Sequence, residues 1–413
     1  MSDAWPTARL ADLAAPVKGA IAGGPFGSDL VSADYVDEGV PVIRGVNLPF
    51  DRKIALDNLV FVSEAKADSL HLNCAVPGDL VFTQRGTLGQ VGLLPQHPRY
   101  SRYLISQSQM KMTVDPSKAS ALYLYYYFRL SSSVTYIENH ALQSGVPHIN
   151  LGLLRKLEVI LPPLVVQHRI AALLETYNDL IANNQRRIAL LEHMAEEIYR
   201  EWFVRMRCPI DTDANRSPER LRPFDSLCEL QRGFDLPDSD MQPGSVPVIA
   251  STSIKGFHNV AKVKPPVITT GRSGSLGTVL YVREPAWPLN TSLWVKDFKG
   301  NSPNLVYFTL RSLHLENFNA GAGVPTLKRN HLRNIKVRIP TAASQSTFDE
   351  LVEPILAKAQ TLRLACAKLV STRDALLPRL IAGKLRVDSL DIQFPPSMQP
   401  PPAEAAQHVA RSR

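Results

Sequence analysis

Hydrophobic residues recur at alternating intervals of four and three along residues 170–202. This spacing is the seam of a coiled coil. Adding 178 to each position gives a second seam over residues 348–380, in which nine of ten positions are apolar. Two helices with matching seams most simply pack on each other, and a globular segment before each favours an antiparallel pair. The first seam consists of Ile170, Leu174, Tyr177, Ile181, Asn184, Ile188, Leu191, Ala195, Ile198 and Trp202.

Two residues are unusual within these seams. Asn184 either fixes the register of the helix pair, at some cost in stability, or lies at a solvated edge, and the sequence leaves both interpretations open. Pro354 should either kink the second helix or mark its true start, because a proline inside a helix removes a hydrogen bond and clashes with the preceding turn.

The segments outside the seams mix strand-like and helix-like patterns. Short β-branched runs such as VPVIRG (40–45), DLVFTQR (79–85), SQMKMTV (108–114) and LEVILP (157–162) are typical of strands. ALYLYYYFRL (121–130) and PNLVYFTLRSL (303–313) predict helices. The pattern therefore predicts the α+β class, with two mixed α/β domains separated by two long helices that form an antiparallel coiled coil.

An aromatic run lies in the first of these helices. Tyr125, Tyr126, Tyr127 and Phe128 could be taken for a base-stacking platform. A similar run recurs in the second half at helical spacing, which is more typical of a core. We therefore leave these residues out of the candidate site.

The two halves of the chain form an internal, pseudo-twofold repeat. VPVI at residue 40 returns at 246, RGTLGQVGLL at 85 returns as SGSLGTVLYV at 273, and QSGVPHINLGLLRKLEVILPP at 143 returns as GAGVPTLKRNHLRNIKVRIPT at 321. The order is kept, while the loops between the matches differ in length. The expected domains are 1–163, helix 164–207, 208–341, helix 342–386, and a proline-rich tail, 387–413, that should be disordered.

Composition narrows the class of protein. The chain has 413 residues, of which 45% are hydrophobic, enough for two or more cored domains. It contains no apolar run long enough to span a membrane and no secretion signal, so we expect it in the cytoplasm. Cys74, Cys208, Cys228 and Cys366 lie far apart, which suggests neither a disulfide framework nor a zinc site. A net charge of +8 favours a polyanionic partner, most commonly nucleic acid.

Motifs of catalysis are missing from the sequence. It contains no phosphate-binding loop of a nucleotide triphosphatase and no methyltransferase motif. The triplet Glu64-Ala65-Lys66, behind Asp57, resembles part of a nuclease cluster, but a solvated turn is the better interpretation. His148 follows Pro147, and a solvated turn histidine is favoured over a functional one.

Several spaced motifs together resemble the specificity subunit of type I restriction-modification enzymes. They are GPFGSDL (24–30), GVPVIRGVNL (39–48), QSGVPHIN (143–150), the long helix from LEVILPP to EWF, the repeat of the whole, and LLPRLIAGKLRV (376–387). The resemblance covers nearly the whole chain to about residue 387. The second copy departs from it where the double proline becomes Pro340-Thr341.

The resemblance implies a non-catalytic subunit that binds double-stranded DNA. Each domain would be a target-recognition domain for one half of a bipartite sequence. The subunit would hold two modification subunits, which bind S-adenosylmethionine and methylate adenine, and restriction subunits could join. The subunit itself would need no cofactor or metal. The apolar helix residues expected to dock modification subunits are Leu190, Met194, Tyr199, Trp202 and Phe203, although Trp202 and Phe203 could instead pack on the chain's own domain.

The repeat separates scaffold residues from candidate reading residues. Gly86, Leu88 and Gly89 recur as Gly274, Leu276 and Gly277, which suggests a shared turn. Residues that differ between the copies and can address base edges or phosphates are candidate DNA contacts. These are Arg44, Asn47, Gln84, Arg85, Ser144 and His148 in the first copy, and Thr252, Ser253, Lys255, Arg272, Ser273, Lys328 and Arg329 in the second.

The helix length predicts the geometry of the target. Residues 170–202 would span about 50 Å as a helix, or roughly one to one and a half turns of duplex. The target should therefore have a fixed, unread gap. The alternative is a coiled-coil scaffold that joins two domains and binds a partner other than DNA.

Overall fold

The computed structural model describes residues 5–96, 99–141, 147–210, 221–321, 323–333 and 335–387. The chain divides into two compact units, 1–182 with 367–413, and 183–366. Each unit contains part of both long helices, α6 (Leu164–Tyr199) and α10 (Ala342–Ile381). Of the expected tail, 387–413, residues 388–413 lie outside the described residues. Among the described helices, none is long and apolar enough to cross a membrane.

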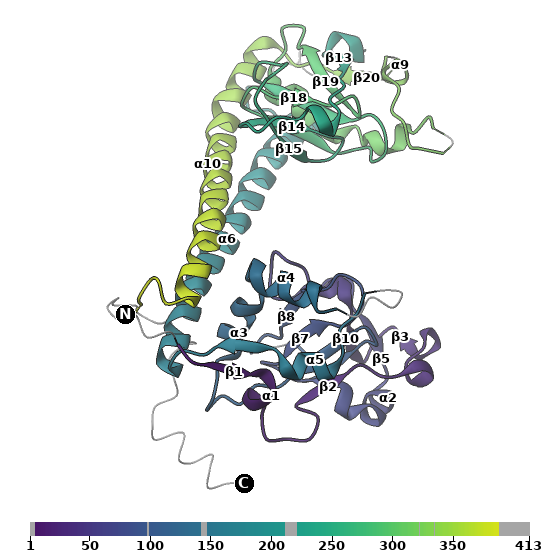
Figure 1. Cartoon of the computed structure of the whole chain (residues 1–413). Helices are drawn as coiled ribbons and strands as arrows, with labels where there is room; N and C mark the ends of the chain where they lie inside the picture. Colours follow the sequence, from purple (N-terminus) through teal and green to yellow (C-terminus); the bar gives the residue numbers. More distant parts are fainter. Residues whose placement is uncertain are drawn as a thin grey trace. The chain divides into compact units, whose positions relative to one another are not determined.

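The first unit contains three sheets (Figure 1). The antiparallel four-stranded sheet has the order β2-β10-β7-β8, and the five-stranded sheet has the order β3-β5-β4-β9-β6, in which β4 and β9 are parallel. The strands are β1 (Thr7–Arg9) paired with β11 (Glu158–Ile160), β2 (Ile21–Gly23), β3 (Tyr35–Val36), β4 (Val40–Ile43), β5 (Val60–Val62), β6 (Cys74–Ala75), β7 (Leu80–Thr83), β8 (Val91–Leu93), β9 (Tyr103–Ile105) and β10 (Gln109–Met112).

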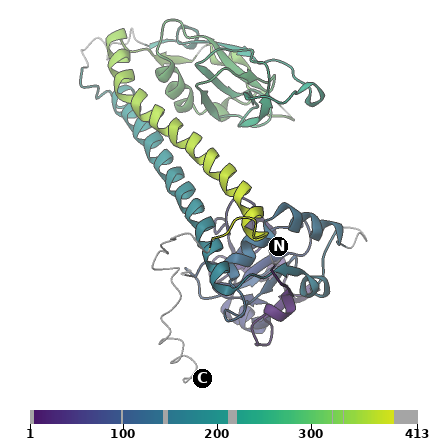
Figure 2. The ribbon, with the colours of Figure 1, turned by 60° about the vertical axis from the view of Figure 1, so that its left-hand side comes forward.

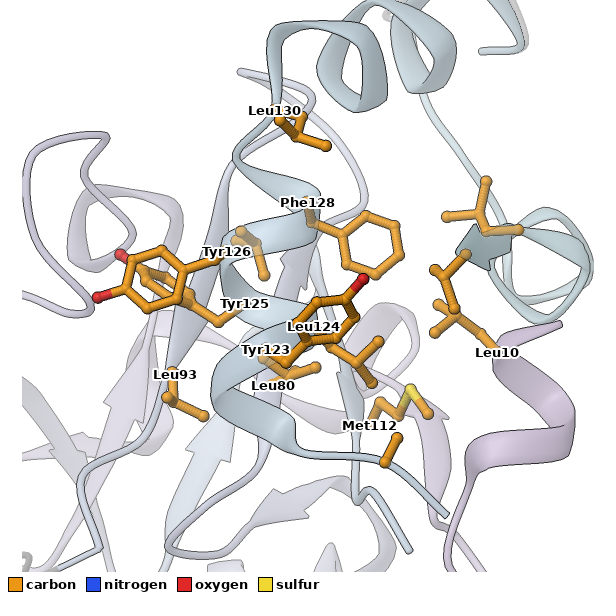
Figure 3. Packing of buried hydrophobic residues seen from close by; sticks show 14 of the residues in the cluster. Leu10, Leu80, Leu93, Met112, Tyr123, Leu124, Tyr125, Tyr126, Phe128 and Leu130 are labelled. Carbon is orange, nitrogen blue, oxygen red and sulfur yellow. The ribbon is translucent and has the colours of Figure 1, made fainter. Parts of the chain in front are cut away.

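Short helices complete this unit. They are α1 (Leu10–Leu13), α2 (Glu64–Ser69), α3 (Ala121–Phe128), α4 (Ser131–Asn139) and α5 (Leu151–Lys156). Figure 3 shows α3 placing its aromatic side chains among residues of the sheet and of α1. Tyr125, Tyr126 and Phe128 are buried, so the prediction that this run is core is confirmed for them. Tyr127 is half-buried and donates a hydrogen bond to the Glu158 carbonyl oxygen at 3.4 Å.

The second unit repeats this topology with fewer strands. Its four-stranded sheet has the order β13-β19-β16-β17, and its three-stranded sheet has the order β15-β14-β18, with β14 and β18 parallel. The strands are β12 (Leu221–Pro223) paired with β20 (Lys336–Arg338), β13 (Glu229–Arg232), β14 (Val246–Ile249), β15 (Ile254–His258), β16 (Val267–Gly271), β17 (Val279–Val282), β18 (Trp287–Pro288) and β19 (Ser292–Asp297), and the helices are α8 (Pro303–Ser312) and α9 (Arg329–Leu332).

The strand and helix predictions are therefore confirmed where the sequence named them. VPVI forms β4 and β14, and the two copies carry the same parallel neighbour, β9 or β18. The repeat found in the sequence is a repeat of topology. In the first copy, β3 pairs with the outer edge of β5. The strand equivalent to β5 in the second copy, β15, has no such neighbour and is an edge strand.

The long helices run antiparallel in the second unit, where both views show them side by side (Figures 1 and 2). Glu192 of α6 forms an ion pair with Arg363 of α10, and in the π-helical segment Arg200–Val204 that follows α6 the ring of Phe203 lies 5.1 Å from that of Phe348. Pro354 lies inside α10, so it does not mark the start of that helix. Asn184 is half-buried, and its two interpretations stay open.

A buried glutamine anchors each long helix to its own domain, at equivalent positions in the two copies. Gln167 accepts a hydrogen bond from the Ser120 amide at 2.9 Å and donates one to the Pro162 carbonyl at 2.8 Å. Gln345, 178 residues later, makes the matching bonds to Ser302 at 2.8 Å and Pro340 at 3.1 Å. Both glutamines are buried.

In each unit a glutamate of the long helix also bonds to side chains of the adjoining domain. Glu175 forms an ion pair with Lys53 and accepts a hydrogen bond from the Tyr126 hydroxyl at 2.7 Å. Its equivalent, Glu353, is held by both terminal nitrogens of Arg283. These bonds from Arg283 lower the pKa of Glu353 below its ordinary value.

The helix starts show why the departure at Pro340-Thr341 is tolerated. Helices α6 and α10 begin at equivalent positions. Where the first copy has Pro163, the second has Thr341, whose hydroxyl oxygen accepts a hydrogen bond from the Ser344 amide at 3.2 Å. This is an N-cap bond, which satisfies an amide that has no partner inside the helix.

Candidate nucleic-acid interface

A glycine turn follows β7 in the first unit and β16 in the second. Gly86 and Gly89 have φ of 105° and 78°, and Gly274 and Gly277 have φ of 87° and 91°. Side chains with a Cβ rarely adopt such angles, so these positions need glycine. The prediction that they form shared scaffold is confirmed.

The residues just before each glycine turn are held by the same backbone bonds in both units. The Ile149 amide donates to the Gln84 carbonyl at 3.0 Å, and the Leu327 amide donates to the Arg272 carbonyl at 2.8 Å. Isolated bridges join Arg85 to His148 and Ser273 to Thr326. Two segments far apart in sequence thus meet at an equivalent place in each copy.

A third segment supports this junction from the other side. The amides of Gln84 and Arg85 both donate to the Ser108 carbonyl oxygen, at 2.7 and 3.3 Å. In the second unit the amides of Arg272 and Ser273 donate to the Thr291 carbonyl oxygen, at 2.8 and 3.1 Å. The backbone is therefore fixed in the same way, while the side chains differ. We call these two junctions the reading turns.

In the second unit the reading turn lies beside an open groove. Arg272 is half-buried there, and its Nη1 donates a hydrogen bond to the Asn290 carbonyl oxygen at 3.2 Å. Lys328 and Arg329 are exposed on the same groove, and α9 begins at Arg329. A wall of guanidinium and ammonium groups around a half-buried arginine suits an anionic ligand that presents hydrogen-bond acceptors. The lining includes Arg232, Asp235, Arg272, Thr326, Lys328, Arg329 and Asn330, and Asp235 forms an ion pair with Arg232 at 3.6 Å.

In the segment after β4, the structure contradicts the assignment of Asn47 as a DNA contact. Asn47 is only 1% exposed; its side-chain oxygen accepts a hydrogen bond from the Arg44 amide at 3.0 Å, and its amide donates one to the Ala55 carbonyl oxygen at 2.9 Å. It is a structural residue, and we remove it from the candidate DNA contacts. Arg44 is half-buried and donates a hydrogen bond to the Asn58 carbonyl oxygen at 3.0 Å.

The equivalent segment of the second unit is the turn between β14 and β15. Thr252, Ser253 and Lys255 are exposed there, and Lys255 forms an ion pair with Asp238. Ser144 lies outside the described residues. The reading turns thus bring together Gln84, Arg85 and His148 in one copy, and Arg272 and Ser273 beside Lys328 and Arg329 in the other.

The Glu64-Ala65-Lys66 triplet takes part in ion pairs within the first unit. Glu64 and Lys66 of α2 form ion pairs with Arg102 and Asp34. Among the residues that the structure describes, no group of three or more metal-ligating side chains comes together. The four cysteines are free thiols, as the sequence indicated.

Comparison with known proteins shows what this chain is similar to. Residues 71–193 match the model of the type I restriction modification DNA specificity domain. The chain is also 22% identical over 366 residues to the Type I restriction enzyme MjaIX specificity subunit of Methanocaldococcus jannaschii, covering 80% of this chain and 82% of that protein. The chain is thus similar to type I restriction-modification specificity subunits over most of its length, and residues 71–193 match their DNA specificity domain.

Two further comparisons point to the same family. The putative type I restriction enzyme MjaX specificity subunit of the same organism is 20% identical over 383 residues, covering 84% of this chain and 88% of that protein. The crystal structure of the type I restriction-modification system S subunit from M. genitalium aligns with a TM-score of 0.57 at 17% identity. That alignment covers 92% of this chain and 97% of the other, and it shows a shared fold.

The expected docking surface changes at its aromatic residues. Tyr199 and Phe203 are buried in the second unit's core, and Trp202 packs against them with its ring 6.0 Å from that of Phe348. Trp202 and Phe203 thus pack on the chain's own domain, which was the alternative interpretation for these two residues, and Tyr199 is buried with them. Leu190 and Met194 are exposed.

One residue of the groove was missed in the sequence. Arg232 ends β13 and lies on the same groove as Arg272. In the sequence, Arg232 is marked only by the glycine that follows it; the equivalence of Gly233 to Gly24 is shown by the structure, in which their amides donate to the Ser292 and Gln109 carbonyl oxygens. It was overlooked because the loops there differ in length between the copies.

Proposed function

We propose that this chain is the DNA-reading subunit of a type I restriction-modification complex and that each unit reads one half of a bipartite target. The single observation that supports this most is the pair of reading turns. Their backbone bonds are the same, at Gln84 and Arg272, whereas the side chains that they present differ. Such a pair suits two half-sites of different sequence, because hydrogen bonds from side chains to base edges carry specificity.

The helix pair would set the gap between the half-sites. Helix α6 has 36 residues, which corresponds to about 54 Å of helix. That length is about one and a half turns of duplex, at about 34 Å a turn. A target with a fixed, unread gap follows from this proposal.

Catalysis would reside in partner subunits. We propose that two modification subunits dock on the helix pair and bind S-adenosylmethionine, and that restriction subunits can join. Leu190 and Met194 are the exposed apolar residues of the helix surface that we assign to this contact. This chain would bind no cofactor and perform no chemical step.

Modified-base sequencing of host DNA tests the proposal. The gene is deleted or retained while the modification subunit is expressed in both strains. Methyladenine in a split motif that disappears on deletion is the expected result, and it also gives the target. Unchanged methylation, together with no salt-dependent retention of the assembled complex on DNA, would overturn the proposal in favour of a scaffold for another partner.

A further inference from the structure

The two most exposed of the described large hydrophobic side chains both belong to the first unit. Phe26 is 82% exposed and Val46 is 75% exposed. Phe26 belongs to GPFGSDL, a motif that the reading turns leave without a role. Apolar side chains this exposed have a solvation cost that a bound ligand can remove.

Phe26 and Val46 follow two segments that are hydrogen-bonded to the Ser106–Gln109 turn, which supports the reading turn of the first unit. The Gly24 amide donates to the Gln109 carbonyl at 2.8 Å, and a Cβ at Gly24 would overlap the Ser106 carbonyl oxygen. On the other side, the Ser106 amide donates to the Ile43 carbonyl at 2.9 Å. The Ser106–Gln109 turn includes Ser108, which holds Gln84 and Arg85.

The loop that carries Phe26 is held firmly. Gln107 donates hydrogen bonds through Nε2 to the carbonyl oxygens of Gly27 and Leu30, at 2.7 and 2.9 Å. The Asp29 amide donates to the Phe26 carbonyl at 2.8 Å. Phe26 is therefore presented outward by a fixed backbone beside the reading turn.

The second unit carries polar residues at both equivalent positions. Counting from the matched amides of Gly24 and Gly233, Phe26 corresponds to Asp235. Counting from the VPVI strands, Val46 corresponds to Thr252. Residues that differ between equivalent positions of the two copies are candidates for reading the DNA sequence, and Phe26 and Val46 meet this criterion.

We propose that Phe26 and Val46 contact the 5-methyl group of a thymine in the half-site read by the first unit. That methyl is the apolar group that the major groove presents, and phenyl or aliphatic side chains contact it. Val46 has no flat face on which a base could stack, so the pair fits a methyl group better than a base plane. The inference rests on the proposed function and adds a predicted base pair to it, a T·A pair in the first half-site.

The test uses the full chain assembled with its modification subunits and the target found by modified-base sequencing. Binding of the wild-type complex to that target is the separate check on the proposed function. Each thymine of the first half-site is then replaced by deoxyuridine, which lacks only the methyl group. At one position we expect the wild-type complex to bind about fourfold more weakly, the effect of losing one buried methyl.

The variants locate the contact by a double-mutant cycle between protein and DNA. Phe26→Ala should remove the preference for thymine over deoxyuridine at that position, and the near-isosteric Val46→Thr should reduce it. Phe257→Ala, an exposed phenylalanine on β15 of the second unit, and Val36→Ala, on β3, are matched controls that should keep the preference. Because Phe26 is exposed, its truncation leaves no cavity, and an unchanged melting temperature verifies the fold.

Three outcomes would overturn the proposal. The first half-site could contain no thymine on either strand. Deoxyuridine could bind the wild-type complex as well as thymine does at every position. Phe26→Ala could weaken binding equally on thymine and deoxyuridine targets, which would indicate insertion between base pairs or a structural role.

Discussion

Arg272 and Lys328 lie on the same groove, but their surroundings give them different tasks. Arg272 is half-buried and oriented by the Asn290 carbonyl, which leaves other guanidinium donors for a base edge. Lys328 is exposed, and an ammonium group in such a position suits a phosphate.

Replacing Arg272 by Ala should relax recognition at one base pair of one half-site. The expected loss of discrimination is about 1 to 3 kcal/mol, the contribution of a good bidentate contact. Affinities of the assembled complex for targets that vary one position at a time measure it. An equal loss on every target would contradict the assignment.

Lys328→Ala should instead weaken binding to all targets alike. Removing one phosphate contact lowers the slope of log affinity against log salt by about one. A salt titration of the same complex provides the measurement. If the slope did not change, Lys328 would not lie on phosphate.

Comparison of the two copies found the reading turns because repeated glycines marked the scaffold and the residues beside them varied. Arg85 with His148, and Ser273 with Thr326, are indeed brought together. Asn47 shows the limit of that reasoning. Its burial depends on the return of the chain at Ala55, and no local pattern around residue 47 indicates that long-range contact.

At the scale of elements, the helix seams could be predicted from periodicity alone, but the partners of their ends could not. Ala195, Ile198 and Trp202 continue the seam, while the structure packs Trp202 and Phe203 into the second domain. A heptad pattern indicates which face is apolar and does not tell a helix partner from a sheet. The same ambiguity explains why Tyr199 and Phe203, expected at a partner interface, are buried in the second unit's core, and why Trp202 packs against them.

Gln345→Ala should destabilise the second unit by about 1 to 3 kcal/mol. The substitution leaves the Ser302 amide and the Pro340 carbonyl without their partner in a buried place. Thermal or urea unfolding measures the loss. Gln185→Ala, at an exposed position of α6, is the control that should change stability little, and equal effects of both would contradict the anchoring role.

The ion pair of Glu353 with Arg283 should make stability depend on pH. The hydrogen bonds from Arg283 lower the pKa of Glu353 in the folded state below its ordinary value of 4.5. A lowered folded pKa gives stability that is present above pH 4.5 and is lost as the pH falls through the folded pKa. The melting-temperature difference between wild type and Glu353→Gln should therefore shrink below pH 4.5.

Glu350→Gln provides the control for that experiment, because Glu350 is exposed on the same helix. Its melting-temperature difference from wild type should vary less with pH. A Glu353→Gln difference that stayed constant down to pH 3 would argue against the ion pair as its source.

At the scale of the whole molecule, both helices cross from one compact unit to the other, α6 between Ala182 and Asn183 and α10 between Cys366 and Ala367. Seven residues inserted at each crossing would keep both seams in phase, because seven is the coiled-coil repeat. Each insertion adds about 10.5 Å of helix.

The lengthened chain should recognise the same two half-sites across a longer gap. We expect an increase of about three base pairs, at 3.4 Å each. Modified-base sequencing of cells that carry the variant reads the new gap directly. An unchanged gap, or altered half-sites, would show that the helix pair does not set the spacing.

The backbone hydrogen bonds of the reading turns bear on how the recognised DNA sequence can change during evolution. The bonds that fix Gln84 and Arg272 come from main-chain groups, which every amino acid except proline supplies in full. If Gln84 and Arg272 read bases, as we propose, a codon change at either position should alter the preferred bases while these backbone bonds stay in place. Under that proposal, a single substitution would give a lineage of cells a new methylation pattern without unfolding the protein.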